Sequence, residues 1–408
     1  MAETKQVPSI RFKGFDHEWI NKPFKETFSG ISNNTLSRAD LNYSSGTVKN
    51  VHYGDVLIKF GELLDAEKAE IPFITNDALA SKYKTSKLQD GDVVIADAAE
   101  DETVGKCTEI NNIGNQIIVS GLHTIPVRPE LKFASKYLGY YMNSNAFHNQ
   151  LIRLMQGTKV LSISKTAIKD TSVVFPKETT EQTQIGIYFQ HLDKLISLHQ
   201  AKVNKLTNLK KAMLEKIFPK QGADVPEIRF KGFAGTWGQK EVNALADRYD
   251  NLRIPITAAN RTPGPVPYYG ANGIQDYVDG YTHEGEFILI AEDGANDLKN
   301  YPVQYVNGKI WVNNHAHVLQ GKTKIAYNLF LKYALSQVNI EPFLVGGGRA
   351  KLNAETLMKI EMPVPESIDE QEKIGSYFQN LDKTIALHRT ELEKLGNLKK
   401  ACSKKMFV

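Results

Sequence analysis

The ends of the chain's two halves repeat each other. Residues 8–15 (PSIRFKGF) recur as residues 226–233 (PEIRFKGF), with seven of eight positions identical. Residues 181–219 match residues 370–408, with 22 of 39 positions identical. A repeat on this scale predicts a duplicated chain with an internal pseudo-twofold relation.

The segments between these shared ends differ. The middles, roughly residues 20–156 and 238–345, share little sequence, and the first is 29 residues longer. We therefore expect the shared ends to do one job twice, while the middles do related jobs on different targets. Duplication followed by neutral drift is the alternative, but it does not explain why the helical ends stayed so similar.

The shared segments 181–220 and 369–408 are predicted to form two long helices. Their apolar residues recur at spacings of three and four, the period of a coiled-coil seam. Thr179, Thr180 and Ser367 supply N-caps, and about 35 residues make a helix of roughly 50 Å. The residues expected to pair the helices are Ile185, Phe189, Leu192, Ile196, His199, Leu206, Ile374, Phe378, Leu381, Ile385, His388 and Leu395, with Leu209 and Leu398 in the same seams.

Exposing the apolar side chains of either seam to water is unfavourable, so each helix needs a partner of equal length. The simplest arrangement packs the two helices against each other, antiparallel, within one chain; pairing of each seam with another subunit is the alternative. His199 and His388 occupy equivalent seam positions, and no Cys, Asp or Glu ligand set accompanies them at seam spacing. We expect them to be packed, hydrogen-bonded structural histidines.

The middles are predicted to be strand-rich mixtures of strands and short helices. Gly and Asp open apolar runs at residues 54–58 and 91–95, and a similar run covers 284–290, which predicts strands. Short helices are expected at 134–154 and 326–338. The fold class is therefore α+β: two strand-rich α/β domains joined by two long antiparallel coiled-coil helices. The corresponding domains are residues 1–180, 181–220, 221–368 and 369–408.

Each middle closes with a glycine-marked loop and a short capped helix. The loops are residues 157–164 (GTKVLSIS) and 346–353 (GGGRAKLN), with Ser164 and Asn353 as N-caps. Cationic side chains beside flexible backbone suit contact with phosphate or a guanine edge, although a solvated connector fits equally well. The candidate DNA contacts in these loops are Thr158, Lys159, Ser162, Arg349 and Lys351.

A second candidate contact lies in residues 267–280, which are dense in tyrosine, asparagine and glycine. Asn272 could pair with an adenine edge, and Tyr269 stands beside it in the same segment. Equally, Asn272-Gly273 is typical of a hairpin turn with tyrosines packed beneath it.

Composition and motifs argue against several classes of protein. The chain has 408 residues, 41% of them hydrophobic, and contains no apolar run long enough to span a membrane. The first six residues are polar, and Cys107 and Cys402 are the only cysteines, so we expect no signal peptide, no disulfide framework and a cytoplasmic protein. Phosphate-loop, amino-methyltransferase, metal-nuclease, zinc-protease and nucleophile-elbow motifs are all missing. We expect a reader rather than an enzyme, with no catalytic, cofactor or metal residues of its own.

Together these features resemble the specificity (S) subunit of type I restriction-modification enzymes. The resemblance covers essentially the whole chain. It rests on the doubled Ile-Arg-Phe-Lys-Gly-Phe…Trp openings and the doubled helices that begin Glu181-Gln and Glu370-Gln. It also rests on Tyr268 to Gly280, which is very like that family's target-recognition domains.

The resemblance implies that each middle is a target-recognition domain that reads one part of a split, asymmetric DNA site. It implies that the two helices set the unread gap and dock two modification subunits, which carry S-adenosylmethionine and methylate adenine. Restriction subunits, with ATP and Mg, would join them. Two other functions remain: a fused methyltransferase or nuclease, against which the missing motifs argue, and a duplicated coiled-coil scaffold that binds proteins without reading DNA.

Overall fold

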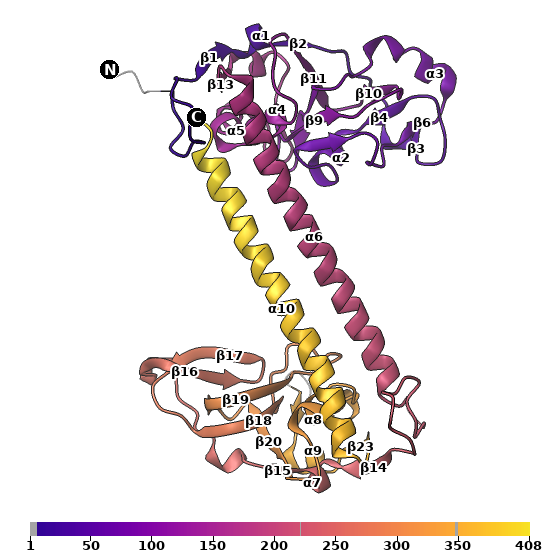
Figure 1. The fold of residues 1–408 in the computed structure, drawn as a ribbon, viewed down its shortest axis with the longest axis vertical. Helices are drawn as coiled ribbons and strands as arrows, with labels where there is room; N and C mark the ends of the chain where they lie inside the picture. Colours follow the sequence, from indigo (N-terminus) through magenta and orange to yellow (C-terminus); the bar gives the residue numbers. More distant parts are fainter. Residues whose placement is uncertain (1–5, 221, 347–349) are drawn as a thin grey trace. The chain divides into compact units, whose positions relative to one another are not determined.

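A computed structural model describes residues 6–220, 222–346 and 350–408. The chain forms two compact units: unit 1 comprises residues 1–199 and 391–408, and unit 2 comprises residues 200–390. Two long helices, α6 (Thr179–Ile217) and α10 (Ile368–Lys405), each contribute one part to unit 1 and another to unit 2 (Figure 1).

Unit 1 is built on mixed sheets with short helices. Its strands are β1 (Ile20–Pro23), β2 (Phe28–Gly30), β3 (Leu41–Asn42), β4 (Lys49–Val51), β5 (Leu63–Asp65), β6 (Phe73–Ile74), β7 (Val93–Ala96), β8 (Ala98–Ala99), β9 (Cys107–Asn111), β10 (Ile118–Ser120), β11 (Thr124–Pro129), β12 (Leu161–Ser162) and β13 (Ser172–Phe175). Its short helices are α1 (Phe24–Thr27), α2 (Tyr53–Ile58), α3 (Asp77–Ser81), α4 (Tyr137–Met142) and α5 (Asn145–Ile152). One sheet has the order β2-β11-β7-β9-β5 and the other β10-β4-β6-β3, with β1-β13 and β12-β8 as two-stranded pairs.

The core of unit 1 draws on both long helices. Strands β7 and β9 are buried along their whole length, which explains the continuous apolar run of β7. The ring of Phe189, on α6, stacks on Phe407, just after α10, with centroids 5.5 Å apart. Tyr137 and Tyr141 of α4 also contact Phe407, so the start of α6 and the end of α10 close the same core.

The strand predicted at residues 54–58 is wrong: this segment is the helix α2. The ring nitrogen Nδ1 of His52 accepts a hydrogen bond from the Gly54 amide at 3.1 Å, which caps the helix. Arg38 holds Asp55 through two hydrogen bonds of 2.9 Å, and Ile58 is 89% exposed. A run of three apolar residues does not separate a strand from a short helix, and here the cap decides.

The other strands and helices predicted for the middles are confirmed with shifted bounds. The predicted strand at 91–95 becomes β7, and the one at 284–290 becomes β18 (His283–Ala291). The helix expected over 134–154 is two helices, α4 and α5. The second predicted helix is α8 (Asn328–Leu335).

Unit 2 contains one larger sheet in the order β15-β20-β18-β19-β16-β17. Its strands are β14 (Gly238–Glu241), β15 (Ala246–Arg248), β16 (Pro263–Gly270), β17 (Gly273–Val278), β18, β19 (Val303–Val312), β20 (Ala316–Gly321), β21 (Leu344–Val345), β22 (Lys351–Leu352) and β23 (Glu361–Val364). The short helices besides α8 are α7 (Val242–Leu245) and α9 (Ala354–Met358). In its core, Phe218, just after α6, packs on Phe330 of α8 and Phe378 of α10.

The long helices run antiparallel in both units, which confirms the expected fold. In unit 1, Tyr188 lies near Cys402, with Oη and Sγ 3.4 Å apart. In unit 2, Lys210 bonds Asp382. Residue numbers therefore increase along α6 in the direction in which they decrease along α10.

The predicted seam residues are distributed as follows. In unit 1, Ile185, Phe189 and Leu192 are buried and Leu395 packs against their cluster, while Ile196 and His199 are half-buried. In unit 2, Ile374, Phe378 and Ile385 are buried, Leu381 packs against the core, and Leu206 and His388 are half-buried.

Leu209 and Leu398 do not belong to the seam as predicted, because they are 41% and 44% exposed. The adjoining Lys210 and Lys399 turn inward instead, and their side chains are 23% and 22% exposed. Each lysine meets an aspartate of the other helix, so an ion pair takes a place that the apolar period assigned to leucine.

The repeated openings fasten the long helices. In unit 1, Arg11 binds Glu181 of α6 through hydrogen bonds of 2.6 and 2.8 Å, and the Ile10 amide donates to the Lys405 carbonyl of α10. In unit 2, Arg229 binds Glu370 of α10 at 2.7 Å through both oxygens, and the residue before it bonds the end of α6. The shared Ile-Arg-Phe sequence therefore performs the same structural task twice.

Candidate nucleic-acid interface

The first glycine loop projects from the pair β8-β12. Gln156 and Ser162 exchange two backbone hydrogen bonds of 2.8 and 2.9 Å that close the loop. Gly157 has φ of +115°, and a Cβ there would lie 2.0 Å from the Val160 carbonyl oxygen, so only glycine fits. Thr158, Lys159 and Ser162 are all exposed on this loop. Ser164 caps the turn that follows, because its Oγ accepts from the Ala167 amide at 3.0 Å.

The second loop occupies the equivalent place in unit 2. It leaves β21 at Gly346 and returns through β22, where Lys351 is exposed. Arg349 lies outside the described residues. The Ile163 amide donates to the Asp97 carbonyl at 2.8 Å, and the Leu352 amide donates to the Glu292 carbonyl at 2.7 Å. Both loops are thus attached to the end of a central strand by the same backbone hydrogen bond.

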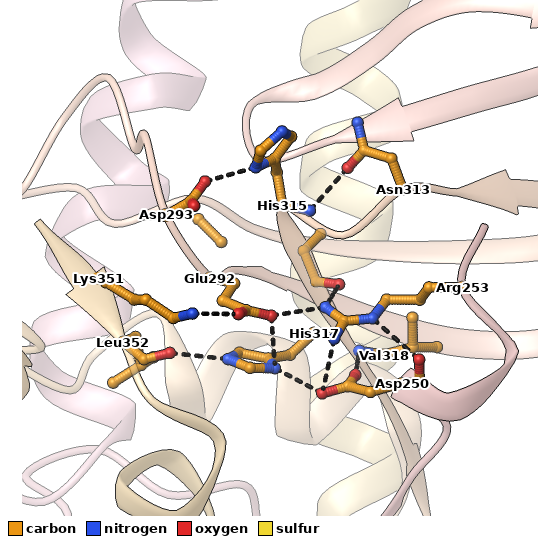
Figure 2. A network of polar contacts seen from close by, with 12 residues as sticks. Asp250, Arg253, Glu292, Asp293, Asn313, His315, His317, Val318, Lys351 and Leu352 are labelled. Atoms are coloured by element: carbon orange, nitrogen blue, oxygen red, sulfur yellow. Dashed lines mark hydrogen bonds and ion pairs between the residues drawn. The ribbon is translucent and has the colours of Figure 1, made fainter. Parts of the chain in front are cut away.

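A polar network lies under the second loop (Figure 2). His317, on β20, has Nδ1 2.6 Å from Asp250, and its Nε2 donates to the Leu352 carbonyl at 2.8 Å. Arg253 donates to Glu292 at 2.7 Å, and Lys351 pairs with the other oxygen of Glu292 at 2.9 Å. The base of the loop is therefore held by side chains from the sheet and from the segment after β15.

Asp250, Glu292 and His317 bring ligand atoms within 4.8 Å of one another, which raises the question of a metal ion. Arg253 lies between the two carboxylates, 2.7 Å from Glu292 and 3.5 Å from Asp250. Lys351 supplies a second cation. These residues do not fit a metal centre, because the positive charge that the carboxylates require comes from side chains.

The electrostatics of this network follow from the same contacts. Burial favours a higher pKa for Asp250, but its hydrogen bond with His317 and the nearby positive charges outweigh burial and lower the pKa. For Glu292, the effect of burial is likewise outweighed by Arg253 and Lys351, and its pKa is lowered. Both carboxylates are therefore ionised in the folded protein at neutral pH.

The predicted hairpin in residues 267–280 is present as β16 and β17, joined by Ala271 and Asn272. The side chain of Asn272 donates to the Gly294 carbonyl and accepts from the Asn296 amide, both at 2.9 Å. Contact with an adenine edge would therefore have to share or replace these bonds. Tyr269 lies on β16, within the hairpin itself; its side chain is half-buried, and burial raises its pKa.

The structure brings the unit 2 candidates together through one loop, residues 291–296. Asn272 holds this loop at Gly294, and Asp293 forms a β-bridge with Lys351. The hairpin tip and the base of the glycine loop are thus neighbours. The sequence did not indicate that this loop connects them, because its residues carry no recognisable motif.

The surface around the first loop includes residues that sequence reasoning missed. Lys165, just past the loop, donates to Asn33 at 2.6 Å, and Asn33 donates to the Gly121 carbonyl at 3.2 Å. The rings of Tyr53 and His123 meet edge to face, with centroids 5.2 Å apart. Asn33 and Lys165 alone are 132 positions apart in the sequence, so no local pattern could have grouped these residues.

Paired helices and one polar loop surface on each of two different domains define a duplicated, two-domain recognition protein. The family described as "Type I restriction modification DNA specificity domain" matches residues 45–208 and 235–397, together about four fifths of the chain. The chain therefore belongs to this family, the non-catalytic DNA-recognition component of type I restriction-modification systems. The resemblance drawn from the repeated ends is confirmed.

Two curated relatives and one solved structure agree. A type I restriction enzyme specificity subunit of Haemophilus influenzae is 51% identical over 126 residues, which cover 31% of this chain and 32% of that protein. The MjaX specificity subunit of Methanocaldococcus jannaschii is 21% identical over 94% of this chain and 91% of its own length. The S subunit from M. genitalium shares the fold, with a TM-score of 0.68, 14% identity and coverage of 98% of this chain and 99% of that one.

In the part of the chain that the structure describes, no helix combines the length and the apolar character needed to cross a membrane.

Proposed function

We propose that this chain reads a bipartite, asymmetric DNA site, one part with each middle. Residues 1–180 and 221–368 act as the two target-recognition domains, and residues 181–220 and 369–408 as the helices that join them. The observation that carries this proposal is the pair of glycine loops, attached by the same backbone bond to two domains whose sheets differ. Equivalent platforms with different surroundings suit two readers of different sequences.

In this proposal, base and phosphate contacts come from the loops and the hairpin. Thr158, Lys159 and Ser162 serve the first half-site. Tyr269, Asn272, Arg349 and Lys351 serve the second. The fixed geometry of Lys351, paired with Glu292, suits a positioned contact, whereas exposed Lys159 suits a phosphate.

The long helices dock two modification subunits that carry S-adenosylmethionine, and restriction subunits that use ATP and Mg join this complex in the cytoplasm. Leu198 and Leu387 support the docking role. They are identical residues at matching positions of α6 and α10, and they are 59% and 61% exposed. Because the same apolar side chain is exposed at equivalent positions of the two helices, each helix offers the same contact, which suits two copies of one partner.

The rival function is a duplicated scaffold that binds proteins without reading DNA. The decisive experiment replaces residues 20–156 with the middle of another S subunit and maps methylated adenines in a host that carries the system. The proposal predicts that one half of the methylated motif changes and the other stays. A change in both halves contradicts independent reading, and the absence of any sequence-specific methylation by the parent system supports the scaffold.

A further inference from the structure

The first glycine loop carries an exposed valine. Val160 is the fourth of the five residues between Gln156 and Ser162, whose backbones exchange two hydrogen bonds. It is 55% exposed, although valine is among the residue types that are most often buried. The next residue, Leu161, packs against the core of unit 1. The two apolar residues of the loop therefore differ: Leu161 anchors the loop, and Val160 is presented to its surroundings.

The backbone at Val160 is held in place within the loop. Its carbonyl oxygen would lie 2.0 Å from a Cβ at position 157, so it packs closely against the backbone of Gly157. Leu161 fixes the chain on the other side of Val160. The side chain adds little freedom of its own, because a β-branched residue is restricted at χ1. Binding through this side chain would thus cost little conformational entropy.

The exposed residues around Val160 are polar. Thr158, Lys159 and Ser162 are exposed on the same loop, and the proposed function assigns all three to DNA. Their side chains can bind a phosphate or a hydrogen-bonding group of a base. Valine has no polar side-chain atom and can do neither. On the same surface, Val160 can therefore contribute only an apolar contact.

DNA offers a specific partner for such a contact. In the major groove, the base edges present hydrogen-bond donors and acceptors, and thymine alone adds an apolar group, its C5-methyl. A valine placed on a loop that contacts base edges therefore favours thymine over the other three bases.

The second glycine loop has the same length as the first. Its closing pair, Val345 and Lys351, also encloses five residues. By sequence count, Val160 corresponds to Arg349, which lies outside the described residues. One position of two equally long loops thus carries side chains of unlike chemistry, as expected of a position that reads different bases in the two half-sites.

We infer that Val160 is a specificity-determining residue that recognises thymine in one half-site, through contact between its methyl groups and the C5-methyl group of that base. This inference rests on the proposed function. It adds an apolar base contact to the polar contacts proposed for the same loop.

The test uses the chain assembled with its modification subunits and the motif found by methylation mapping. Competition binding compares duplexes in which each position of the motif is varied in turn. Val160→Ala should lose preference for thymine at one position of one half-site, by about fourfold, which is the effect of one methyl contact. Val7→Ala is the matched control. It makes the same substitution at a valine that is 38% exposed and precedes the first repeated opening, and it should leave every preference unchanged.

A base analogue isolates the methyl group. Deoxyuridine in place of thymidine at the affected position removes the C5-methyl and keeps the base pair. The parent should bind the deoxyuridine duplex about fourfold more weakly, whereas Val160→Ala should bind both duplexes equally. Val160→Ile keeps a branched apolar side chain, so it should keep the preference for thymine and show that the loop tolerates substitution.

Two results would overturn the inference. One is a parent complex that binds thymidine and deoxyuridine duplexes equally at every thymine of the motif. The other is equal weakening of Val160→Ala on all duplexes, which would show that Val160 supports the loop or contacts the DNA backbone rather than a base. Both results leave the proposed function standing. If the parent complex itself shows no sequence preference, the proposed function fails instead.

Discussion

Lys210 of α6 donates to Asp382 of α10 at 2.5 Å, and the same pair recurs 189 positions away as Lys399 and Asp193 at 2.6 Å. Each aspartate also accepts from a tyrosine of its own domain at 2.7 Å: Tyr333 for Asp382, and its counterpart in unit 1 for Asp193. In each unit, the lysine–aspartate ion pair therefore joins the two long helices and, through the tyrosine, joins them to the domain of that unit. It also fixes the register of the helices.

We predict that Asp382→Asn loosens unit 2. The change removes the charge that Lys210 faces and leaves Lys332, whose pKa burial lowers to about 8, beside an amide. Because the site is partly exposed, we expect a loss of about 1–2 kcal/mol in stability. Hydrogen exchange of the part of α10 that lies in unit 2 measures the change.

Asp193→Asn is the matched control and should act on unit 1 alone. Lys210→Met combined with Asp382→Asn should cost less than the sum of the single changes. Additive losses would show that the two residues do not stabilise each other.

The sequence predicted the helices and most of the seam because apolar residues at spacings of three and four are a strong local signal. It assigned Leu209 and Leu398 to the seam because it could not show that Asp382 and Asp193 face these turns. Which side chain turns inward depends on a charge from the other helix, and that relation is not contained in either helix alone.

A second prediction concerns Arg253→Met in the network under the second glycine loop. The substitution leaves Asp250 and Glu292, which are 11% and 13% exposed, without their shared cation. We expect unit 2 to lose about 3–5 kcal/mol. Because the folded pKa values of both acids are lowered, the stability they contribute is present above their unfolded values of about 4 and lost as the pH falls below them.

Urea unfolding of the parent and the variant at several pH values tests this. The parent should lose stability on acidification more steeply than Arg253→Met. A variant as stable as the parent, with the same acid response, would show that Lys351 and His317 neutralise the carboxylates without Arg253.

A third prediction concerns Glu109, which is 1% exposed. Burial raises its pKa to about 7, although the Gly139 and Lys136 amides donate to it. The folded pKa exceeds the unfolded value of about 4.3, so stability is greatest below the unfolded pKa and falls as the pH rises toward 7 and beyond, by roughly 3 kcal/mol. Hydrogen exchange of α4, corrected for intrinsic rates, should therefore show less protection at pH 8 than at pH 5.

Glu109→Gln should flatten this dependence, because the amide does not titrate. Glu109→Asp keeps the carboxyl group and should keep the pH dependence. A parent protein whose α4 is equally protected at both pH values would contradict the raised pKa.

The candidate site was predictable only in part. Glycine and cationic residues indicated both loops in the sequence, because backbone positions with positive φ favour glycine. The residues that contact the second loop were not predictable in this way. Asn272 donates to the Gly294 carbonyl, and Asp293 forms a β-bridge with Lys351, and both Gly294 and Asp293 belong to a loop without a sequence motif.

A fourth prediction separates phosphate contact from base contact at Lys159. This exposed lysine lies on a loop whose two ends are joined by the backbone hydrogen bonds between Gln156 and Ser162. Lys159→Ala should weaken binding to all duplexes alike and reduce the slope of log K against log salt by about 1. Lys177→Ala, an exposed lysine between β13 and α6, is the control. A change of preference at one base position would assign Lys159 to base reading instead.

The last prediction tests whether the paired helices set the gap between the half-sites. The lysine–aspartate register makes residues 207–210 of α6 and 382–385 of α10 matching segments. Duplicating both lengthens the pair by about 6 Å and keeps a Lys210–Asp382 pair at the original place, so the contacts of each domain with its helix ends survive.

Duplex DNA rises about 3.4 Å per base pair, so the enzyme with both duplications should methylate the same half-sites with a gap longer by one or two base pairs. Duplicating only residues 207–210 shifts one helix against the other and should cost more activity for the same gain in length. Methylation mapping reads both results. An active double duplication with an unchanged gap would show that something other than the helices sets the spacing, and altered half-sites with the original gap would remove recognition from the middles.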